Sequence, residues 1–408
     1  MSTEQVASES LPSNQPQTAV LRSRSVQREL NPLKTACCLI TTALLTFVTC
    51  GVLMLVLLFL PNQQHLSITH EFGIGFDLSP SYATVAVSYP NGSIHPIARV
   101  EGNRAYREMM FRLSLPSSKH IQYALSAPFP RPMITCLITK QSQPVSDIGE
   151  GYSDIPRQIW RKALKKLWLP ASRDVYTLSR MIRALREQAS NFVGEPVSAA
   201  TISIPHLAAL YNEDIRDAFE YLSLLYIDFD PSPCYFRPLH TVFASYAGNN
   251  LGICQDYKND AACKEEEKHI QRQYVLTVGY THTSLTTSQV SIVGCLFPAE
   301  APALENLRLR YDTRHEEFYW DMVRDMLRSP VVDSWVQGNF SMVLLHGDAT
   351  EKPRFREVLG EVINDVLDGQ VEIIDQQPEF SAAKGAAELA KRAIFRKTKD
   401  LADIASEL

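Results

Sequence analysis

The feature that most constrains this chain of 408 residues is Ala36–Leu60, a run of about 25 residues without a single charge. A stretch of this length and polarity can cross the hydrocarbon core of a bilayer as a helix. A cleaved signal peptide is the alternative, but the apolar run is too long, begins too deep in the chain and lacks a clean cleavage site. The sequence therefore predicts one transmembrane signal-anchor helix at 36–60.

The charges that flank this run predict its orientation. Four basic residues precede it between Arg22 and Lys34, whereas no lysine or arginine occurs between Pro61 and Ala98. Because basic flanks stay on the cytosolic side, we expect a type II single-pass membrane protein. Its N-terminus would lie in the cytosol, and its large domain in the endoplasmic reticulum lumen, the secretory pathway or the extracellular space.

Composition predicts a tail before the span and a linker, a folded domain and a second tail after it. Residues 1–35 are rich in polar residues and proline and poor in large apolar groups, so they are predicted to form a disordered cytosolic tail. A linker at 61–70, a folded domain at 71–397 and a charged C-terminal tail at 398–408 follow. A net charge of −5 gives no electrostatic argument for nucleic acid as a partner.

Two kinds of motif fit a lumenal or extracellular domain. Asn91 and Asn339 each begin an Asn-x-Ser sequon for glycosylation. Cys254 and Cys263 bracket a short polar loop that a disulfide could close in an oxidising compartment. The sequence has no Cys-x-x-Cys pair and no histidine cluster with zinc spacing, so no metal site is predicted.

The stretch Glu71–Ser93 has the pattern of a strand, a tight turn, a second strand and an Asn-Gly turn. Asp77 ends the first strand, and Ser79 and Ser81 lie in the tight turn. An acid followed by small hydroxyl residues can place a phosphate against backbone N–H groups. The hairpin is therefore a candidate phosphate-binding site, and the alternative is that Asp77 is a strand-end carboxylate that accepts hydrogen bonds from the turn N–H groups.

The remainder of the domain alternates strands and helices, as in α/β proteins. The expected elements, in chain order, are helices at Ala105–Phe111, Arg157–Leu167 and Val175–Phe192, a strand at Ala199–Pro205, helices at Asn212–Leu225 and Phe236–Gly248, a charged loop at Lys258–His269, a strand-turn-strand unit at Gln273–Val293, helical segments in Leu304–Leu327, a strand at Ser341–Leu345, and helices at Pro353–Val366 and Ser381–Ile394. The basic face formed by Arg161, Lys162, Lys165 and Lys166 is expected to be solvated.

This order of motifs resembles the nucleotide-binding domain of the 70-kDa heat-shock chaperones, in the actin-like ATPase superfamily. The two strand-turn-strand units match its phosphate-binding hairpins, and His346–Thr350 is similar to its adenosine-binding turn. The resemblance covers about Glu71 to Arg396. It implies an α/β, bilobal actin-like ATPase fold of two ribonuclease-H-like subdomains behind a single N-terminal transmembrane helix. It also implies these candidate nucleotide contacts: Asp77, Ser79, Ser81, Thr281, Thr283, Gly347 and Asp348.

Most residues that the family uses to hold phosphate are replaced. Its first Gly-Thr-Thr corresponds to Ser79-Pro80-Ser81, where proline removes a backbone donor. Its second acid and three glycines correspond to Gly279–Ser284, which has neither the acid nor the three glycines. Lys119 is the nearest counterpart of the family's lysine near the γ-phosphate. Because each lost donor or ligand weakens transition-state stabilisation, we expect negligible ATP hydrolysis.

These replacements predict a non-catalytic interaction module without a cofactor, whose protein partner the sequence does not identify. The alternative is a weak ATP- or ADP-binding, nucleotide-sensing protein that uses the seven candidate contacts, with Mg²⁺. An enzyme of the related sugar-kinase branch is disfavoured because no aspartate in a glycine-rich cleft stands out as a general base. No β-sandwich pattern follows the closing helix, so a peptide-binding half like that of the chaperones is not expected.

Overall fold

The structure, a computed structural model, describes residues 68, 70–118, 155–228, 239–292, 303–332, 340–366 and 371–406, together with 46, 49 and 51. From residue 68 onward these belong to one compact unit, Pro61–Leu408. Except for three positions, the predicted tail and transmembrane segment lie outside the described residues, as does most of the predicted linker. Among the residues described, no helix has both the length and the apolarity that a membrane crossing requires.

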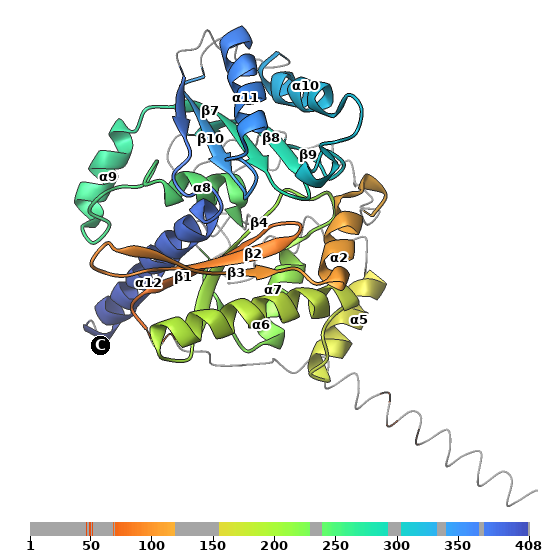
Figure 1. Ribbon diagram of the computed structural model, residues 1–408. Helices are drawn as coiled ribbons and strands as arrows, with labels where there is room; N and C mark the ends of the chain where they lie inside the picture. Colours follow the sequence, from red (N-terminus) through yellow and green to blue (C-terminus); the bar gives the residue numbers. More distant parts are fainter. Residues whose placement is uncertain are drawn as a thin grey trace, which may run out of the picture. The chain divides into compact units, whose positions relative to one another are not determined.

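Two mixed β-sheets that share one topology form the framework of this unit (Figure 1). In the first sheet the strand order is β3-β2-β1-β4-β5, with β6 paired to β4, and in the second it is β11-β10-β7-β8-β9. The strands β7 to β11 therefore repeat the order of β1 to β5. Their bounds are β1 Gly73–Leu78, β2 Tyr82–Ser88, β3 Ile94–Glu101, β4 Ala199–Ile204, β5 Leu225–Tyr226, β6 Leu239–His240, β7 Gln273–Tyr280, β8 Leu285–Ile292, β9 Ala303–Asn306, β10 Met342–His346 and β11 Glu372–Ile374.

In each sheet three antiparallel strands form a meander, and the next strands add in parallel through helical crossovers. One helix, α7 or α11, follows the first parallel strand in both sheets. The helical bounds are α2 Arg104–Ser114, α5 Ile155–Lys166, α6 Arg173–Val193, α7 Asn212–Tyr221, α8 Thr241–Gly248, α9 Asp260–His269, α10 Tyr319–Val332, α11 Pro353–Val366 and α12 Ser381–Ser406, with short 3-10 turns at Pro116–Ser118 and Tyr311–Thr313.

The alternation of side chains along β1 separates the two faces of the first sheet. Ile74 and Phe76 are fully buried in the core that α6 covers. Gly73 and Gly75 face α12, and a Cβ added at Gly75 would lie 2.0 Å from the backbone nitrogen of Ala387. Only glycine lets α12 approach the strand this closely.

The same close approach occurs between α8 and α12. A Cβ at Gly248 would lie 1.9 Å from the Ser381 carbonyl oxygen, and one at Gly385 would lie 1.7 Å from the Ala244 carbonyl oxygen. The Ser381 hydroxyl also donates to Ser245 Oγ at 3.2 Å. The two helices therefore meet backbone against backbone, with small side chains between them.

The second sheet has its own core, built around the end of β7. The ring of Tyr280 stacks on Phe355 of α11 with centroids 4.3 Å apart, and its hydroxyl lies 2.8 Å from that of Tyr319 on α10. All three side chains are buried. These contacts hold α10 and α11 against the strand that leads into the second turn.

The α/β class expected from the sequence is confirmed, with two mixed sheets. The first hairpin forms as predicted, and the helix predicted at Pro353–Val366 has those bounds. The closing helix begins at Ser381 as predicted but continues to Ser406, through most of the predicted tail at 398–408.

Two expectations about secondary structure were wrong. The predicted charged loop at Lys258–His269 contains helix α9, because the side chain of Asn259 caps its first turn by accepting from Ala262 N–H at 3.2 Å. The helix expected from Phe236 begins only at Thr241, because Leu239–His240 pairs in parallel with β4. The segment Leu304–Leu327 contains a helix as expected, since α10 begins at Tyr319, and its first residues form the edge strand β9, which pairs with β8.

Candidate functional site

Asp77 lies at the end of β1, opposite Ser203 of β4. Its Oδ1 accepts hydrogen bonds from Ser203 Oγ at 2.6 Å and from Thr241 Oγ1 at 3.2 Å. The side chain is buried, and this burial raises the pKa of its carboxyl to about 6, against the two hydroxyl donors that lower it. Asp77 is therefore an internal acid held by neighbouring strands and α8.

The first turn, Ser79 to Tyr82, is closed by the Ser79 N–H, which donates to the Tyr82 carbonyl at 2.9 Å. Pro80 has no N–H to offer a ligand. The Tyr106 hydroxyl donates to the Ser79 carbonyl at 2.9 Å. Both serine hydroxyls, those of Ser79 and Ser81, are buried and have no hydrogen-bond partner.

The second turn, Thr281 to Ser284, has the same closing bond, from Thr281 N–H to the Ser284 carbonyl at 2.9 Å. Thr281 Oγ1 accepts from the N–H groups of Thr283 at 3.1 Å and Ser284 at 2.9 Å. Asp348 Oδ1 accepts from the His282 N–H at 3.2 Å. All four backbone N–H groups of this turn are therefore occupied by groups of the same chain.

Gly347 and Asp348 follow β10 and lie against the second turn. Gly347 has φ of +100°, and a Cβ there would be 2.5 Å from the Tyr280 carbonyl oxygen, so this position requires glycine. The next residue, Asp348, is nearly buried and its Oδ2 lies 2.9 Å from Arg99 Nη1. A carboxylate of the protein thus accepts the His282 N–H of the second turn and contacts Arg99 at the same time.

Arg99, on β3 of the first sheet, connects Asp348 to the first hairpin. Its guanidinium lies 4.0 Å from the centre of the Tyr82 ring and contacts Glu379 and Glu101 at 2.6 Å each. Partial burial alone would lower the pKa of Arg99, but these carboxylates and Asp348 raise it above its usual value. The cation stays charged and joins both candidate turns.

The register that brings Asp77 beside Ser203 brings Gly279 beside His346 in the second sheet. A Cβ at Gly279 would lie 2.1 Å from His346 Cε1, so the imidazole fills the space above the glycine. Burial lowers the pKa of His346 to about 4, and its Nε2 has no hydrogen-bond partner. A neutral ring therefore lies beside the position where the resemblance places an acid.

The structure groups most of the predicted contacts. Thr281, Thr283, Gly347 and Asp348 meet at the second turn, and Asp77, Ser79 and Ser81 lie in or beside the first. Sequence reasoning missed three residues that contact these candidates, which are Arg99, Ser203 and Thr241, and it did not place His346 against Gly279. Ser203 and His346 reach their partners through strand register, and Arg99 and Thr241 reach theirs through contacts between distant elements, for which the local sequence carries no signal. Lys119 lies outside the described residues.

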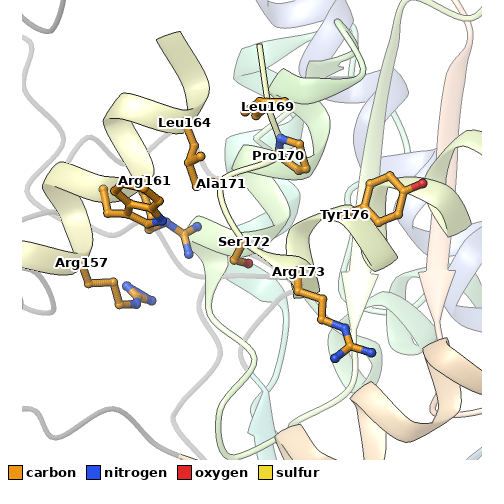
Figure 2. Close-up of a pocket in the computed structure, with 10 residues that line it drawn as sticks. Arg157, Arg161, Leu164, Leu169, Pro170, Ala171, Ser172, Arg173 and Tyr176 are labelled. Atoms are coloured by element: carbon orange, nitrogen blue, oxygen red, sulfur yellow. The ribbon is translucent and has the colours of Figure 1, made fainter. Parts of the chain in front are cut away.

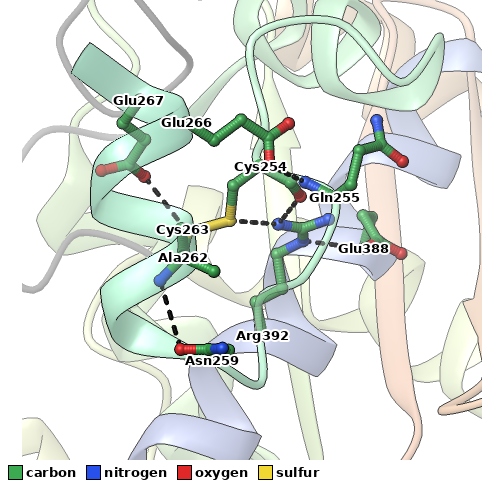
Figure 3. Close-up of a disulfide and its surroundings, with 9 residues drawn as sticks. All are labelled: Cys254, Gln255, Asn259, Ala262, Cys263, Glu266, Glu267, Glu388 and Arg392. Carbon is green, nitrogen blue, oxygen red and sulfur yellow. Dashed lines mark hydrogen bonds and ion pairs between the residues drawn. A yellow bond between two sulfur atoms is a disulfide. The ribbon is translucent and has the colours of Figure 1, made fainter. Parts of the chain in front are cut away.

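Cys254 and Cys263 form the expected disulfide, with Cα atoms 5.2 Å apart (Figure 3). Arg392 of α12 donates to the Cys254 carbonyl at 2.7 Å and lies 3.4 Å from its Sγ. Within the described residues these two cysteines and Glu267 are the one candidate cluster of metal ligands, and the disulfide removes both thiolates from it.

Of the two predicted glycosylation sites, the structure describes one. Asn91 lies on the exposed turn between β2 and β3, where its Oδ1 accepts from Ser93 N–H and Oγ. Asn339 is outside the described residues.

No protein-family model matches the chain, and a comparison with curated proteins also finds no match.

Proposed function

We propose that this chain is a single-pass membrane protein whose large domain has the actin-like ATPase fold and acts as a non-catalytic interaction module. The strand order 3-2-1-4-5, present twice in succession with a helix after each fourth strand, supports two ribonuclease-H-like subdomains. The helices that end the two repeats, α8 and α12, pack on each other. This arrangement is what the resemblance to chaperone ATPase domains implies.

The observation that carries the non-catalytic assignment is the occupation of the second turn. A phosphate clamp needs backbone N–H groups that point at the ligand. Here Thr281 Oγ1, the Ser284 carbonyl and Asp348 already accept all four. The Asp348 carboxylate would also repel a phosphate at close range, because both carry negative charge.

Thermal unfolding with millimolar Mg-ATP or Mg-ADP tests this assignment. A ligand that binds only the native state stabilises it by about 2.7 kcal/mol at a hundred times its Kd. We expect the same melting temperature with either nucleotide as with magnesium alone. A clear upward shift with either would overturn the non-catalytic assignment and call for hydrolysis assays on Asp77→Ala.

One observation favours weak nucleotide binding as the second candidate. The hydroxyls of Ser79 and Ser81 are buried without partners, beside Asp77. A phosphate at the first turn would satisfy them, since buried polar groups are ordinarily paired. On this candidate Pro80→Gly restores a backbone donor and increases the nucleotide-induced shift, while Ser79→Ala with Ser81→Ala abolishes it. On the interaction-module proposal neither variant responds to nucleotide.

The membrane assignment rests on the uncharged segment 36–60 and its flanking charges. Alkaline extraction of membranes that contain the full chain tests it, because only integral proteins stay in the pellet. Glycan mapping at Asn91 then reports the side on which the domain lies. Release by alkali would overturn the anchor, and an unmodified, protease-accessible domain on the cytosolic side would overturn the orientation.

A further inference from the structure

Helix α5 is attached to the domain by its basic stripe. Arg157, Arg161 and Lys165 recur every four residues and so share one face of the helix. Arg157 contacts Glu213 of α7, and Lys165 lies 2.5 Å from Glu220 at the other end of the same helix. Of the basic face expected to be solvated, Arg161 and Lys165 therefore face the protein, whereas Lys162 is exposed.

Arg161 is the centre of this attachment. Its side chain is 5% exposed, with Nη1 at 2.8 Å from Asp214 Oδ1 and Nη2 at 2.5 Å from Asp217 Oδ2. Burial alone would lower the pKa of Arg161, but the carboxylates of Asp214, Asp217 and Glu213 raise it above its usual value. The helix is therefore held mainly by ion pairs rather than by an apolar face.

The consequence is that large apolar side chains remain on the outside. Trp160 and Trp168 are each 65% exposed. Four neighbours in sequence or on the first turn of α6 are also about half exposed or more. We call this set the α5 patch: Ile159, Trp160, Leu167, Trp168, Leu169 and Tyr176. An amphipathic helix ordinarily buries its apolar face, so an exposed aromatic set of this size marks a surface that another phase or partner covers.

A pocket of about 580 Å³ lies beside the α5 patch, between α5 and the start of α6 (Figure 2). Trp160, Leu164, Leu169 and Tyr176 supply its apolar lining. Arg173 begins α6 at the same rim and is exposed. Aromatic and apolar walls beside an exposed guanidinium suit the boundary between lipid headgroups and acyl chains.

The charged residues of α5 and of the loop that leads to α6 are all basic. From Ile155 to Arg173 the sequence contains six basic residues and no acid. Three of the six pair with α7, and Lys162 and Arg173 remain exposed next to the α5 patch. Tryptophan and leucine together with lysine and arginine are the composition of helices that lie in a membrane interface.

We infer that the α5 patch docks on the surface of a lipid bilayer, with Trp160 and Trp168 in the headgroup layer. The inference rests on the proposed membrane anchor, because only about ten residues, 61–70, separate the predicted span from the domain. Ten extended residues reach at most about 35 Å, so the domain stays near the membrane that holds the anchor. Tethering at this distance lets a weak interfacial contact form as an intramolecular one.

The test uses the full chain reconstituted in vesicles of zwitterionic lipid, with and without acyl-chain bromine as a quencher of tryptophan fluorescence. The predicted span contains no tryptophan, so quenching reports on the domain. Two of the four tryptophans belong to the patch, and we expect brominated lipid to remove up to about half of the emission. Trp160→Ala with Trp168→Ala should abolish the quenching, whereas Trp320→Phe, in α10, should preserve it.

The combined results distinguish docking of the α5 patch on lipid from anchoring by the predicted span. Both tryptophans are largely exposed, so their replacement should leave the circular dichroism spectrum and melting temperature unchanged, which verifies that the variant folds. Retention after alkaline extraction together with quenching supports docking. Retention without quenching leaves the anchor intact and overturns docking. Self-association that disappears in the double tryptophan variant, again without quenching, would assign the patch to a second copy of the chain.

Discussion

Gly279 and His346 face each other at the ends of β7 and β10, at the register that places Asp77 opposite Ser203 in the first sheet. In the first sheet this position holds the acid Asp77, which accepts a hydrogen bond from Ser203. In the second sheet it holds Gly279, and the imidazole of His346 occupies the space where a side chain would lie. The absence of a side chain at Gly279 and the position of the His346 ring are therefore coupled. A side chain at Gly279 and the ring of His346 exclude each other.

The first prediction concerns this pair. Gly279→Ala should lower the free energy of unfolding by about 1–3 kcal/mol, because its Cβ overlaps the buried ring. Gly360→Ala is the matched control, since a Cβ there meets no atom within 4 Å and should stabilise α11 by up to about 1 kcal/mol. Gly279→Asp should be rescued by His346→Ser, which recreates the arrangement of the first sheet. Urea unfolding measures all four variants, and a neutral Gly279→Ala would disprove the steric account.

The second prediction follows from the pKa of Asp77, which burial raises to about 6. Because an unfolded aspartate titrates near 3.9, the folded state binds more protons between about pH 4 and pH 6, and stability falls as pH rises through that window. Asp77→Asn removes this slope. Relative to the wild type it should gain about 2–3 kcal/mol from pH 4 to pH 7.

Unfolding free energies of both proteins across this pH range measure the effect. The contribution of His346, whose low pKa destabilises the fold as pH falls from about 6.5 to about 4, is common to both proteins and cancels in the difference. A difference that does not change with pH would mean that Asp77 titrates normally in the folded state.

Local patterns predicted the strands that lead into both turns, because β-branched alternation and Asn-Gly turns act within a few residues. They also placed Asp77 at the end of the first strand, whereas Thr281 and Asp348 were singled out by the resemblance, and the structure brings these two to the second turn. The partners of these residues come from distant strands. Ser203 is 126 positions from Asp77, and only parallel register, which local periodicity does not specify, joins them.

The orientation of α5, with Arg161 toward the protein and Trp160 toward solvent, could not be predicted either. Periodicity shows that Arg161 and Trp160 lie on different faces, but a basic stripe is ordinarily solvated and an aromatic one ordinarily buried. The acids of α7 at Asp214 and Asp217 reverse that preference by pairing with Arg161. That helix lies more than fifty residues further along the chain.

The third prediction concerns Asp348. Asp348→Ala removes the acceptor for the His282 N–H and an anion from Arg99, and should cost about 1–3 kcal/mol of unfolding free energy. Glu101→Gln changes a far more exposed partner of the same guanidinium and should stay within about 0.5 kcal/mol of the wild type. Chemical denaturation measures both variants. Equal effects would show that Asp348 is no more important to the turn than a surface charge.

The fourth prediction concerns Arg161. Arg161→Met leaves Asp214 and Asp217 without their main cation, which should cost about 3–5 kcal/mol or detach α5 from the domain. Lys162→Met is the adjacent, exposed control and should have little effect. Hydrogen exchange followed by mass spectrometry distinguishes global unfolding from local detachment, since the latter exposes α5 alone. The proposed attachment fails if the two variants exchange alike.

The fifth prediction concerns the disulfide. Peptide mapping without reduction should recover Cys254 joined to Cys263. In the chain-entropy model a loop of this length stabilises the fold by about 2–3 kcal/mol, so reduction should lower stability by that amount. Cys254→Ala with Cys263→Ala should match the reduced wild type. Two free thiols in protein purified from its own membrane would contradict both the bond and the oxidising compartment.

The second turn satisfies its four amides with groups of the same chain, so its folded geometry requires nothing from solution. A domain that binds nucleotide is stabilised by mass action, and its folded fraction rises with nucleotide concentration. This turn provides no such link. On the proposed non-catalytic function, the yield of folded protein should therefore be the same in a compartment rich in ATP and in one that contains none.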